Sequence, residues 1–255
     1  MCDSVYVIKF KCMKNNLIKV SDRFYIYPYE ELTDRPNLFY IKGDDYSVVV
    51  DAGNSAKHVK QFYDCLNDNN LPLPFYTIIS HWHWDHTFGL SAINGISLSS
   101  EKARDKLIEV SKWKWNIEEM RKREKTGEDI AFCNDCILLE YEDLNDIKVV
   151  SSDQIVNDDL HMDLGGIEID ILPRVSTHTD DTLYVYIKDE KALIVEDADN
   201  CDFYNHDYYD PIKLEKMIEF FENLDYEYHY LGHASRESKM QAIDRLNKVL
   251  IDIKK

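Results

Sequence analysis

The run SHWHWDH at residues 80–86 constrains this chain more than any other feature. It directly follows residues 75–79, a strand-like apolar stretch, so a rigid element would present His81, His83, Asp85 and His86 from a tight turn. His81 and His83 alternate along the chain and therefore project to one side of an extended backbone. Zinc prefers about four ligands in tetrahedral geometry, and so short a loop cannot give all four side chains to one ion. The motif predicts two metals, one on His81 and His83 and one on Asp85 and His86.

A histidine-rich turn without a metal is the alternative for residues 80–86, but three histidines clustered with an aspartate favour the metal. The pattern HxHxDH after an apolar strand resembles the signature of the metallo-β-lactamase superfamily. The resemblance covers roughly residues 21–100 and 150–250. The second half of the chain should therefore contain the family's remaining metal ligands.

The resemblance implies three further metal ligands. His178 lies in the segment STHTD at 176–180, Asp197 follows the apolar run at 192–195, and His233 ends the segment LGH at 231–233. One position departs from the family pattern, because Glu196 stands where the family often has glycine. Asp199 is therefore the alternative ligand from this loop.

Outside the seven ligands, Asp51 precedes Gly53 at the end of a strand-like run. The resemblance implies that its carboxylate orients a metal ligand from behind. An aspartate that merely forms a turn before a glycine is the other interpretation.

In the family, these residues form a hydrolase site with two Zn²⁺ ions per chain, with iron or manganese as alternative metals. His81, His83 and His178 would hold one ion, Asp85, His86 and His233 the other, and Asp197 would bridge them. The hydroxide shared by two such ions would cleave an ester, thioester, lactone or phosphoester bond of a small-molecule substrate. Asp85 would be the catalytic side chain that orients this hydroxide or carries its proton.

Three other functions remain open. A di-iron redox protein on the same fold typically replaces one motif histidine with a carboxylate and adds a flavin domain, and this sequence shows neither feature. True β-lactamases place other residue types at the position of Asp197, so we do not expect antibiotic hydrolysis. A metal-free binding module would have no need of the full ligand set.

Strand-like and helix-like segments predict the fold class. Strands are expected at 5–10, 17–27, 37–42, 46–50, 75–79, 93–98, 167–172, 182–187, 192–195 and 226–231, and helices at 55–69, 101–125, 211–223 and from 235 onward. Each half yields a sheet whose loops carry ligand candidates. The pattern predicts two mixed sheets packed face to face with helices outside, and the resemblance names this α+β fold a four-layer αβ/βα sandwich. We expect a single domain over residues 1–255.

Residues 101–148 fit the family pattern least and predict a mainly helical insertion over the site. Its basic residues at 112–125 could meet an anionic substrate, and Trp113 and Trp115 could stack on an apolar one. Favourable i,i+4 pairs, Glu118 with Lys122 and Glu119 with Arg123, indicate a solvated helix face instead. Aromatic residues at 203–209 could likewise grip an acyl chain or ring, or simply pack under a long loop.

Composition excludes several classes of protein. The 48 acidic against 30 basic residues give a net charge of −18, which repels phosphate backbones and argues against nucleic-acid binding. No apolar run reaches the roughly 18 residues of a membrane span, and the first residues lack a signal-peptide pattern, so we expect a cytoplasmic protein. The six cysteines are scattered and predict free thiols, Cys133 and Cys136 included. A homo-oligomer is compatible with the sequence.

Overall fold

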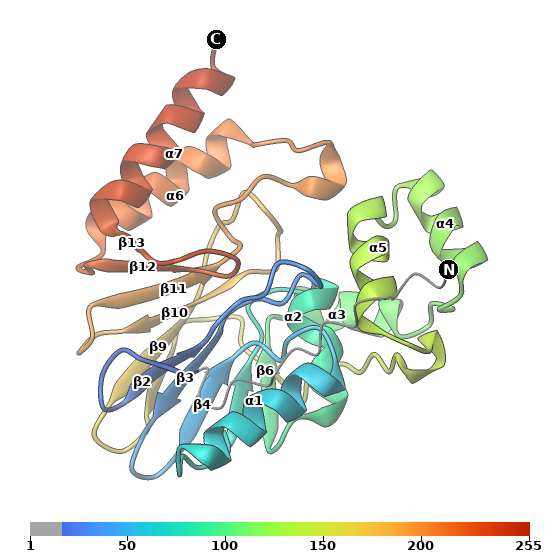
Figure 1. Cartoon of the computed structure of the whole chain (residues 1–255). Coiled ribbons are helices and arrows are strands. Elements are labelled where there is room, and N and C mark those ends of the chain that lie inside the picture. Colours follow the sequence, from blue (N-terminus) through green and yellow to red (C-terminus); the bar gives the residue numbers. More distant parts are fainter. Residues whose placement is uncertain (1–16) are drawn as a thin grey trace, which may run out of the picture.

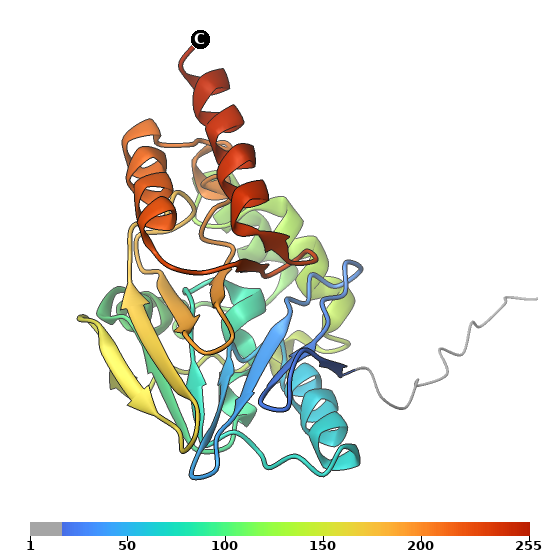
Figure 2. The same cartoon turned by 90° about the vertical axis from the view of Figure 1, so that its left-hand side faces the viewer.

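The computed structural model describes residues 17–255, so the strand expected at 5–10 lies outside it. Two mixed sheets pack face to face (Figures 1 and 2). The first has the order β1 (Ile18–Lys19), β2 (Phe24–Tyr27), β3 (Leu38–Lys42), β4 (Ser47–Val50), β5 (Tyr76–Ile78), β6 (Ile96–Ser99), β7 (Gln154–Ile155). The second has the order β13 (Glu237–Ser238), β12 (Tyr228–Leu231), β11 (Ala192–Glu196), β10 (Leu183–Ile187), β9 (Glu168–Pro173), β8 (Leu160–Asp163). The predicted α+β sandwich is confirmed.

Alternating side chains along the strands build the four layers. Phe39 and Ile41 of β3 face the main core between the sheets. Their neighbours Leu38 and Tyr40 face outward and pack under α1 (Ala56–Asp68). In the second sheet, Tyr184 of β10 likewise faces outward, beneath α6 (Pro211–Asn223) and α7 (Lys239–Ile253). Because successive side chains of a strand point to opposite faces, both faces of each sheet are buried. Figure 1 shows α1 on one outer face of the sandwich and α6 and α7 on the other.

Side-chain caps set the starts of these helices. Ser55 accepts a hydrogen bond from the backbone of His58, and Asp210 accepts two, from Ile212 and Lys213, ahead of Pro211. Both starts are as predicted. The start expected for the last helix, at residue 235, is wrong because residues 237–238 first pair with β12 as β13. The predicted apolar stripe of α7 is also only partly buried, since Leu246 is inaccessible and Met240 is 75% exposed.

One predicted strand, residues 17–27, is a hairpin of β1 and β2. The hydroxyl of Ser21 accepts hydrogen bonds from the backbone N–H groups of Arg23 and Phe24 and closes the turn. The residues at the turn, 21–23, are three consecutive polar residues and interrupt the alternation. The expectation of one continuous strand over 17–27 is therefore wrong.

The helix predicted over 101–125 is two helices, α3 (Glu101–Val110) and α4 (Ile117–Thr126), followed by an unpredicted α5 (Ala131–Glu140). The break comes because Asn116 caps α4, its side chain accepting from the backbone of Glu119 at 3.0 Å. Gly127 ends α4 in the left-handed region at φ +76°, as predicted. The three helices follow β6 in sequence, beside the sheets (Figure 1).

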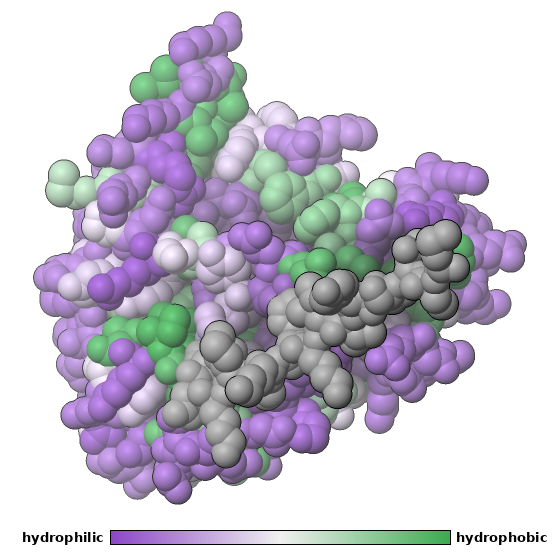
Figure 3. Space-filling model, viewed as in Figure 1, coloured by the Kyte–Doolittle hydropathy of each residue, from purple (hydrophilic) through white to green (hydrophobic). Residues whose placement is uncertain are grey.

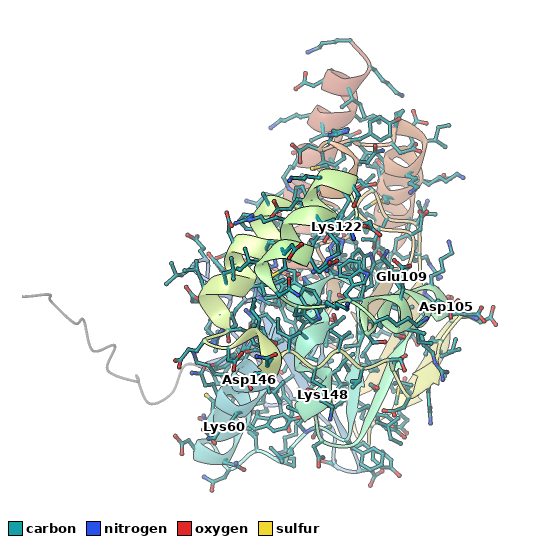
Figure 4. The ribbon with its side chains drawn as sticks, turned by 90° about the vertical axis from the view of Figure 1, so that its right-hand side faces the viewer. Lys60, Asp105, Glu109, Lys122, Asp146 and Lys148 are labelled. Carbon is teal, nitrogen blue, oxygen red and sulfur yellow. The ribbon has the colours of Figure 1, made fainter. Side chains whose placement is uncertain are left out.

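The ion pairs predicted on α4 do not form. Lys122 instead lies 3.6 Å from Glu119, and Figure 4 shows it on the outer side of α4. Arg123 is only 5% exposed and stacks on the rings of Trp113 and Trp115, at 4.4 and 4.7 Å. The segment at 113–123 is thus stabilised by stacking of the Arg123 guanidinium on two tryptophan rings. The i,i+4 spacing of charged residues could not predict this contact.

Four short helices complete the secondary structure: α2 (Trp84–Thr87), η1 (Phe88–Ala92), η2 (Leu144–Asp146) and η3 (Phe203–Asn205). Within residues 17–255, no helix has the length and apolar character needed to cross a bilayer.

Candidate metal centre

Seven side chains meet where strands of both sheets end. His81 and His83 follow β5, and Asp85 and His86 open α2. The remaining three come from the second half: His178 from the loop between β9 and β10, Asp197 directly after β11, and His233 after β12. The structure thus brings together every predicted ligand. They form two clusters, His81 with His83 and His178, and Asp85 with His86, Asp197 and His233.

Three imidazole nitrogens converge in the first cluster. Nδ1 of His83 lies 3.0 Å from Nε2 of His81 and 2.9 Å from Nε2 of His178. Two ligand nitrogens on a tetrahedral zinc ion lie about 3.3 Å apart, given Zn–N distances of about 2.0–2.1 Å. All three rings are buried. The donor set therefore fits a divalent ion bound by three histidines.

The second cluster pairs two histidines with two carboxylates. Oδ2 of Asp85 lies 2.9 Å from Nε2 of His86 and 3.0 Å from Nε2 of His233. Oδ2 of Asp197 lies 3.3 and 3.5 Å from the same two nitrogens. Mixed nitrogen and oxygen donors suit a second divalent ion of the same kind.

Four of the five rings have a partner for the nitrogen that points away from the clusters. Nδ1 of His86 meets Oδ2 of Asp51 at 2.7 Å, and Nδ1 of His81 meets the Ser80 hydroxyl at 2.9 Å. Nδ1 of His178 lies 2.7 Å from the carbonyl oxygen of Cys201, and Nδ1 of His233 lies 3.5 Å from Asp34. Such partners fix the ring orientation and leave the other nitrogen free for a metal. The orienting role expected for Asp51 agrees with its contact to His86.

Glu196 occupies the family's glycine position at a visible cost. Its backbone lies in the left-handed region at φ +54°, and both carboxylate oxygens are buried without a hydrogen-bond partner. Burial, with Asp51 nearby, raises the pKa of Glu196 well above its usual range. Gly232 is required opposite, because a Cβ there would come within 2.6 Å of Asp197 and 2.8 Å of Glu196. The glutamate at position 196 therefore does not displace Asp197 from its cluster.

Asp199, the alternative ligand, lies outside both clusters. Its carboxylate is 2.9 Å from Nε2 of His229 and 2.7 Å from Arg245. Asp199 and His229 thus form a buried structural pair. The expectation of Asp199 as the alternative ligand from this loop is therefore wrong.

Burial and neighbouring charges shift the pKa values of four of the ligand histidines, downward in the first cluster and upward in the second. Burial, reinforced by neighbouring histidines, lowers the pKa of His81 and His83 well below the usual value, so both rings stay neutral as metal ligands must. Burial would also lower the pKa of His233, but Asp197 and Asp85 outweigh it and raise the pKa to about 9. Asp85 and Asp51 likewise raise the pKa of His86. In the metal-free protein His86 and His233 therefore hold protons that His81 and His83 do not.

Zinc binding at pH 7 is expected to release protons from His86 and His233, because a metal takes only the neutral ring. Since the pKa of His233 is raised from 6.5 to about 9, its stabilisation of the metal-free protein is complete below about pH 6.5 and disappears as pH rises through about 9. Metal affinity at this cluster should accordingly rise with pH through about 9, because both His233 and His86 must lose a proton to bind the metal. Calorimetric titrations in buffers of different ionisation enthalpy count the protons, and zinc binding without proton release at pH 7 would contradict the assignment.

A cavity of about 200 Å³ lies in front of the two clusters. Besides five of the candidate ligands, its lining includes side chains that sequence reasoning did not single out: Asp34, Ile130, Phe132 and Asn200. Asp34 lies in the loop between β2 and β3, where the sequence indicates only a turn, and Ile130 and Phe132 belong to the unpredicted start of α5. Phe203 and Tyr204, from the aromatic group at 203–209, also line the cavity.

An αβ/βα sandwich with paired histidine and aspartate clusters at the strand ends defines a metallo-β-lactamase fold. The chain belongs to the metallo-beta-lactamase superfamily, whose family model matches residues 33–233. Membership together with the two clusters supports a metal-dependent hydrolase. A search of curated proteins gives no match.

Solved structures with low sequence identity share the fold. A metallo-beta-lactamase from Pontibacter korlensis has a TM-score of 0.64 at 14% identity, covering 91% of this chain and 96% of its own. A metallo-beta-lactamase family protein from Thermus thermophilus has a TM-score of 0.64 at 13% identity, with coverages of 92% and 81%. The stereoselective inverting sec-alkylsulfatase from Pseudomonas sp. has a TM-score of 0.63 at 13% identity and covers 92% of this chain, but only 41% of the sulfatase is matched.

Proposed function

We propose that this protein is a binuclear zinc hydrolase that cleaves an ester-type bond of a small-molecule substrate. The observation that carries the proposal is the convergence of five histidines and two aspartates from both sheets into two adjoining clusters. His81, His83 and His178 would hold one ion and Asp85, His86 and His233 the other, with Asp197 shared between them. Two such ions would supply hydroxide at neutral pH, by lowering the pKa of water to about 7, and polarise the substrate.

The side chains of this chain prepare that chemistry. Asp51, Ser80 and the carbonyl of Cys201 hold three rings in one orientation, so little reorganisation is needed when the ions bind. Asp85 is only 5% exposed and faces the cavity, where its carboxylate is placed to orient an attacking water or carry its proton. Most of the ligand side chains are buried, which strengthens these electrostatic interactions.

Elemental mass spectrometry of untagged protein purified without chelator tests the proposal directly. We expect about two zinc ions per chain, and fewer in His178→Ala. His161→Ala is the matched control, because His161 lies on β8, pairs with Asp170 at 2.8 Å, and belongs to neither cluster. Two iron ions per chain would instead support the redox protein. Absence of metal even after reconstitution would contradict the hydrolase.

A further inference from the structure

The cavity in front of the candidate metal clusters has two walls of different chemistry. One wall carries the ligand candidates. The other is apolar and comes from two elements, Ile130, Phe132 and Cys133 around the start of α5 and Phe203 and Tyr204 of η3. A substrate whose reacting group lies at the clusters would therefore place its remaining atoms against apolar side chains.

The lining offers no lysine or arginine to an anionic substrate. Within the described chain it holds three carboxylates, Asp34, Asp85 and Asp197, and three histidines that are candidate metal ligands. The basic residues of 112–125 do not line it either. Lys106 and Lys213 border a neighbouring cavity, and each is already paired there, at 2.8 Å with Glu109 and 2.6 Å with Asp180. The two proposed metal ions would attract an oxyanion by themselves, but the lining adds no arginine or lysine to that attraction, so its apolar side chains favour an uncharged acyl group.

The apolar wall is left accessible to solvent. Phe132 is 58% exposed and Phe203 41% exposed, although both are large apolar side chains beside a buried site. Figure 3 shows apolar residues gathered where the loop carrying η3 faces α5. An apolar acyl chain would cover these rings and gain from the loss of their contact with water.

We propose that the cavity takes an uncharged carboxylic ester, thioester or lactone with an apolar acyl chain of medium length. This rests on the proposed hydrolase function and narrows it. A cavity of about 200 Å³ is small for a ligand pocket, so a short to medium acyl chain such as hexanoyl is expected to fit better than a long one. In the reaction, a water oxygen bonds to the acyl carbon and the bond to the leaving oxygen or sulfur breaks. The leaving group takes one proton of the water and the other is released to solvent. The products are a carboxylate and an alcohol or thiol, which stay in one molecule when the substrate is a lactone.

Binding of hexanamide, an uncharged acyl compound, tests the wall without relying on turnover. By calorimetry on the metal-loaded protein, Phe132→Ser is expected to weaken binding about tenfold, because it removes one ring of the apolar wall. Leu139→Ser is the matched control, since Leu139 is also on α5 and 61% exposed but does not line the cavity. No binding of hexanamide, or equal losses in the two variants, would overturn the proposal.

Hydrolysis of three nitrophenyl esters distinguishes failure of the acyl-chain proposal from failure of the proposed hydrolase function. We expect 4-nitrophenyl hexanoate to be cleaved with higher kcat/KM than the acetate, and 4-nitrophenyl phosphate hardly at all. The ratio of hexanoate to acetate should fall about tenfold in Phe132→Ser and stay unchanged in Leu139→Ser. Preference for the phosphate, or equal cleavage of hexanoate and acetate, would overturn the inference alone. Hexanamide binding with no cleavage of any ester by protein loaded with two zinc ions would overturn the proposed hydrolase.

Discussion

Asp197→Ala should lower kcat/KM for any substrate of this protein by about a thousandfold or more, and reduce the bound metal to fewer than two ions per chain. A metal that polarises the reacting group supplies several kcal/mol of transition-state stabilisation, and each 1.36 kcal/mol is a factor of ten in rate. Oδ2 of Asp197 lies within 3.5 Å of ring nitrogens of both His86 and His233. Its removal takes away one carboxylate of the second cluster and the one ligand proposed to be shared with the first.

The fold should survive this change, because the Asp197 side chain lies at the cluster and belongs to none of the apolar cores. Circular dichroism with elemental analysis and steady-state kinetics gives the three readouts. Asp189→Ala is the matched control, since Asp189 is an exposed carboxylate in the turn before the same strand, β11. If Asp197→Ala kept two ions and wild-type kcat/KM, the bridging role of Asp197 would be wrong.

The candidate site was largely predictable because its first four members lie in one short segment. The spacing of His81, His83, Asp85 and His86 predicts a metal site even when the fold is unknown. His178, Asp197 and His233 are single polar residues after strands, and only the family resemblance connected them to the motif. Asp34 could not be predicted, since a loop far away in sequence brings it 3.5 Å from His233 and its own surroundings indicate only a turn.

The fold was predictable where one period dominates a segment. Strands with alternating or continuous apolar residues and helices with clear caps, such as those at Ser55 and Asp210, appear close to where they were expected. α5 was missed because its apolar residues surround the helix: Cys136 and Ile137 pack inward, while Phe132 and Leu139 stay exposed. A helix without an amphipathic period gives no helical signal in the sequence.

A buried ion pair joins this helical segment to the sandwich. The guanidinium of Arg35 lies 2.7 and 2.9 Å from the two carboxylate oxygens of Glu140, the last residue of α5. The Glu140 carboxylate is 1% exposed and also accepts a hydrogen bond from the hydroxyl of Ser55, the cap of α1. Next to it, the hydroxyl of Tyr141 donates to the carbonyl of Asn54 at 3.0 Å. One carboxylate thus connects α5, α1 and the loop that carries Asp34.

Arg35→Ala is therefore expected to lower the free energy of unfolding by about 3–5 kcal/mol, because it leaves the buried Glu140 carboxylate without its counter-charge. Urea denaturation measures the loss, and hydrogen exchange should show faster exchange at the end of α5. Arg121→Ala is the matched control. It breaks a more exposed pair between α4 and α5, in which Arg121 is 41% and Asp135 62% exposed, and should cost no more than about 1 kcal/mol.

The loss of stability in Arg35→Ala could come from an unpaired buried charge or from lost packing of the loop. The double variant Arg35→Met with Glu140→Leu distinguishes these two explanations. If the cost of Arg35→Ala comes from an unpaired buried charge, replacing both partners by apolar side chains of similar size should recover most of the stability. If it came from lost packing of the loop, the double variant would be as unstable as the single one. Recovery of stability would also show that α5 can keep its place without the ion pair, and hexanamide binding should then recover with it. An unstable double variant would mean that packing of the loop at Arg35, and not the charge pair, keeps α5 and the cavity wall in place.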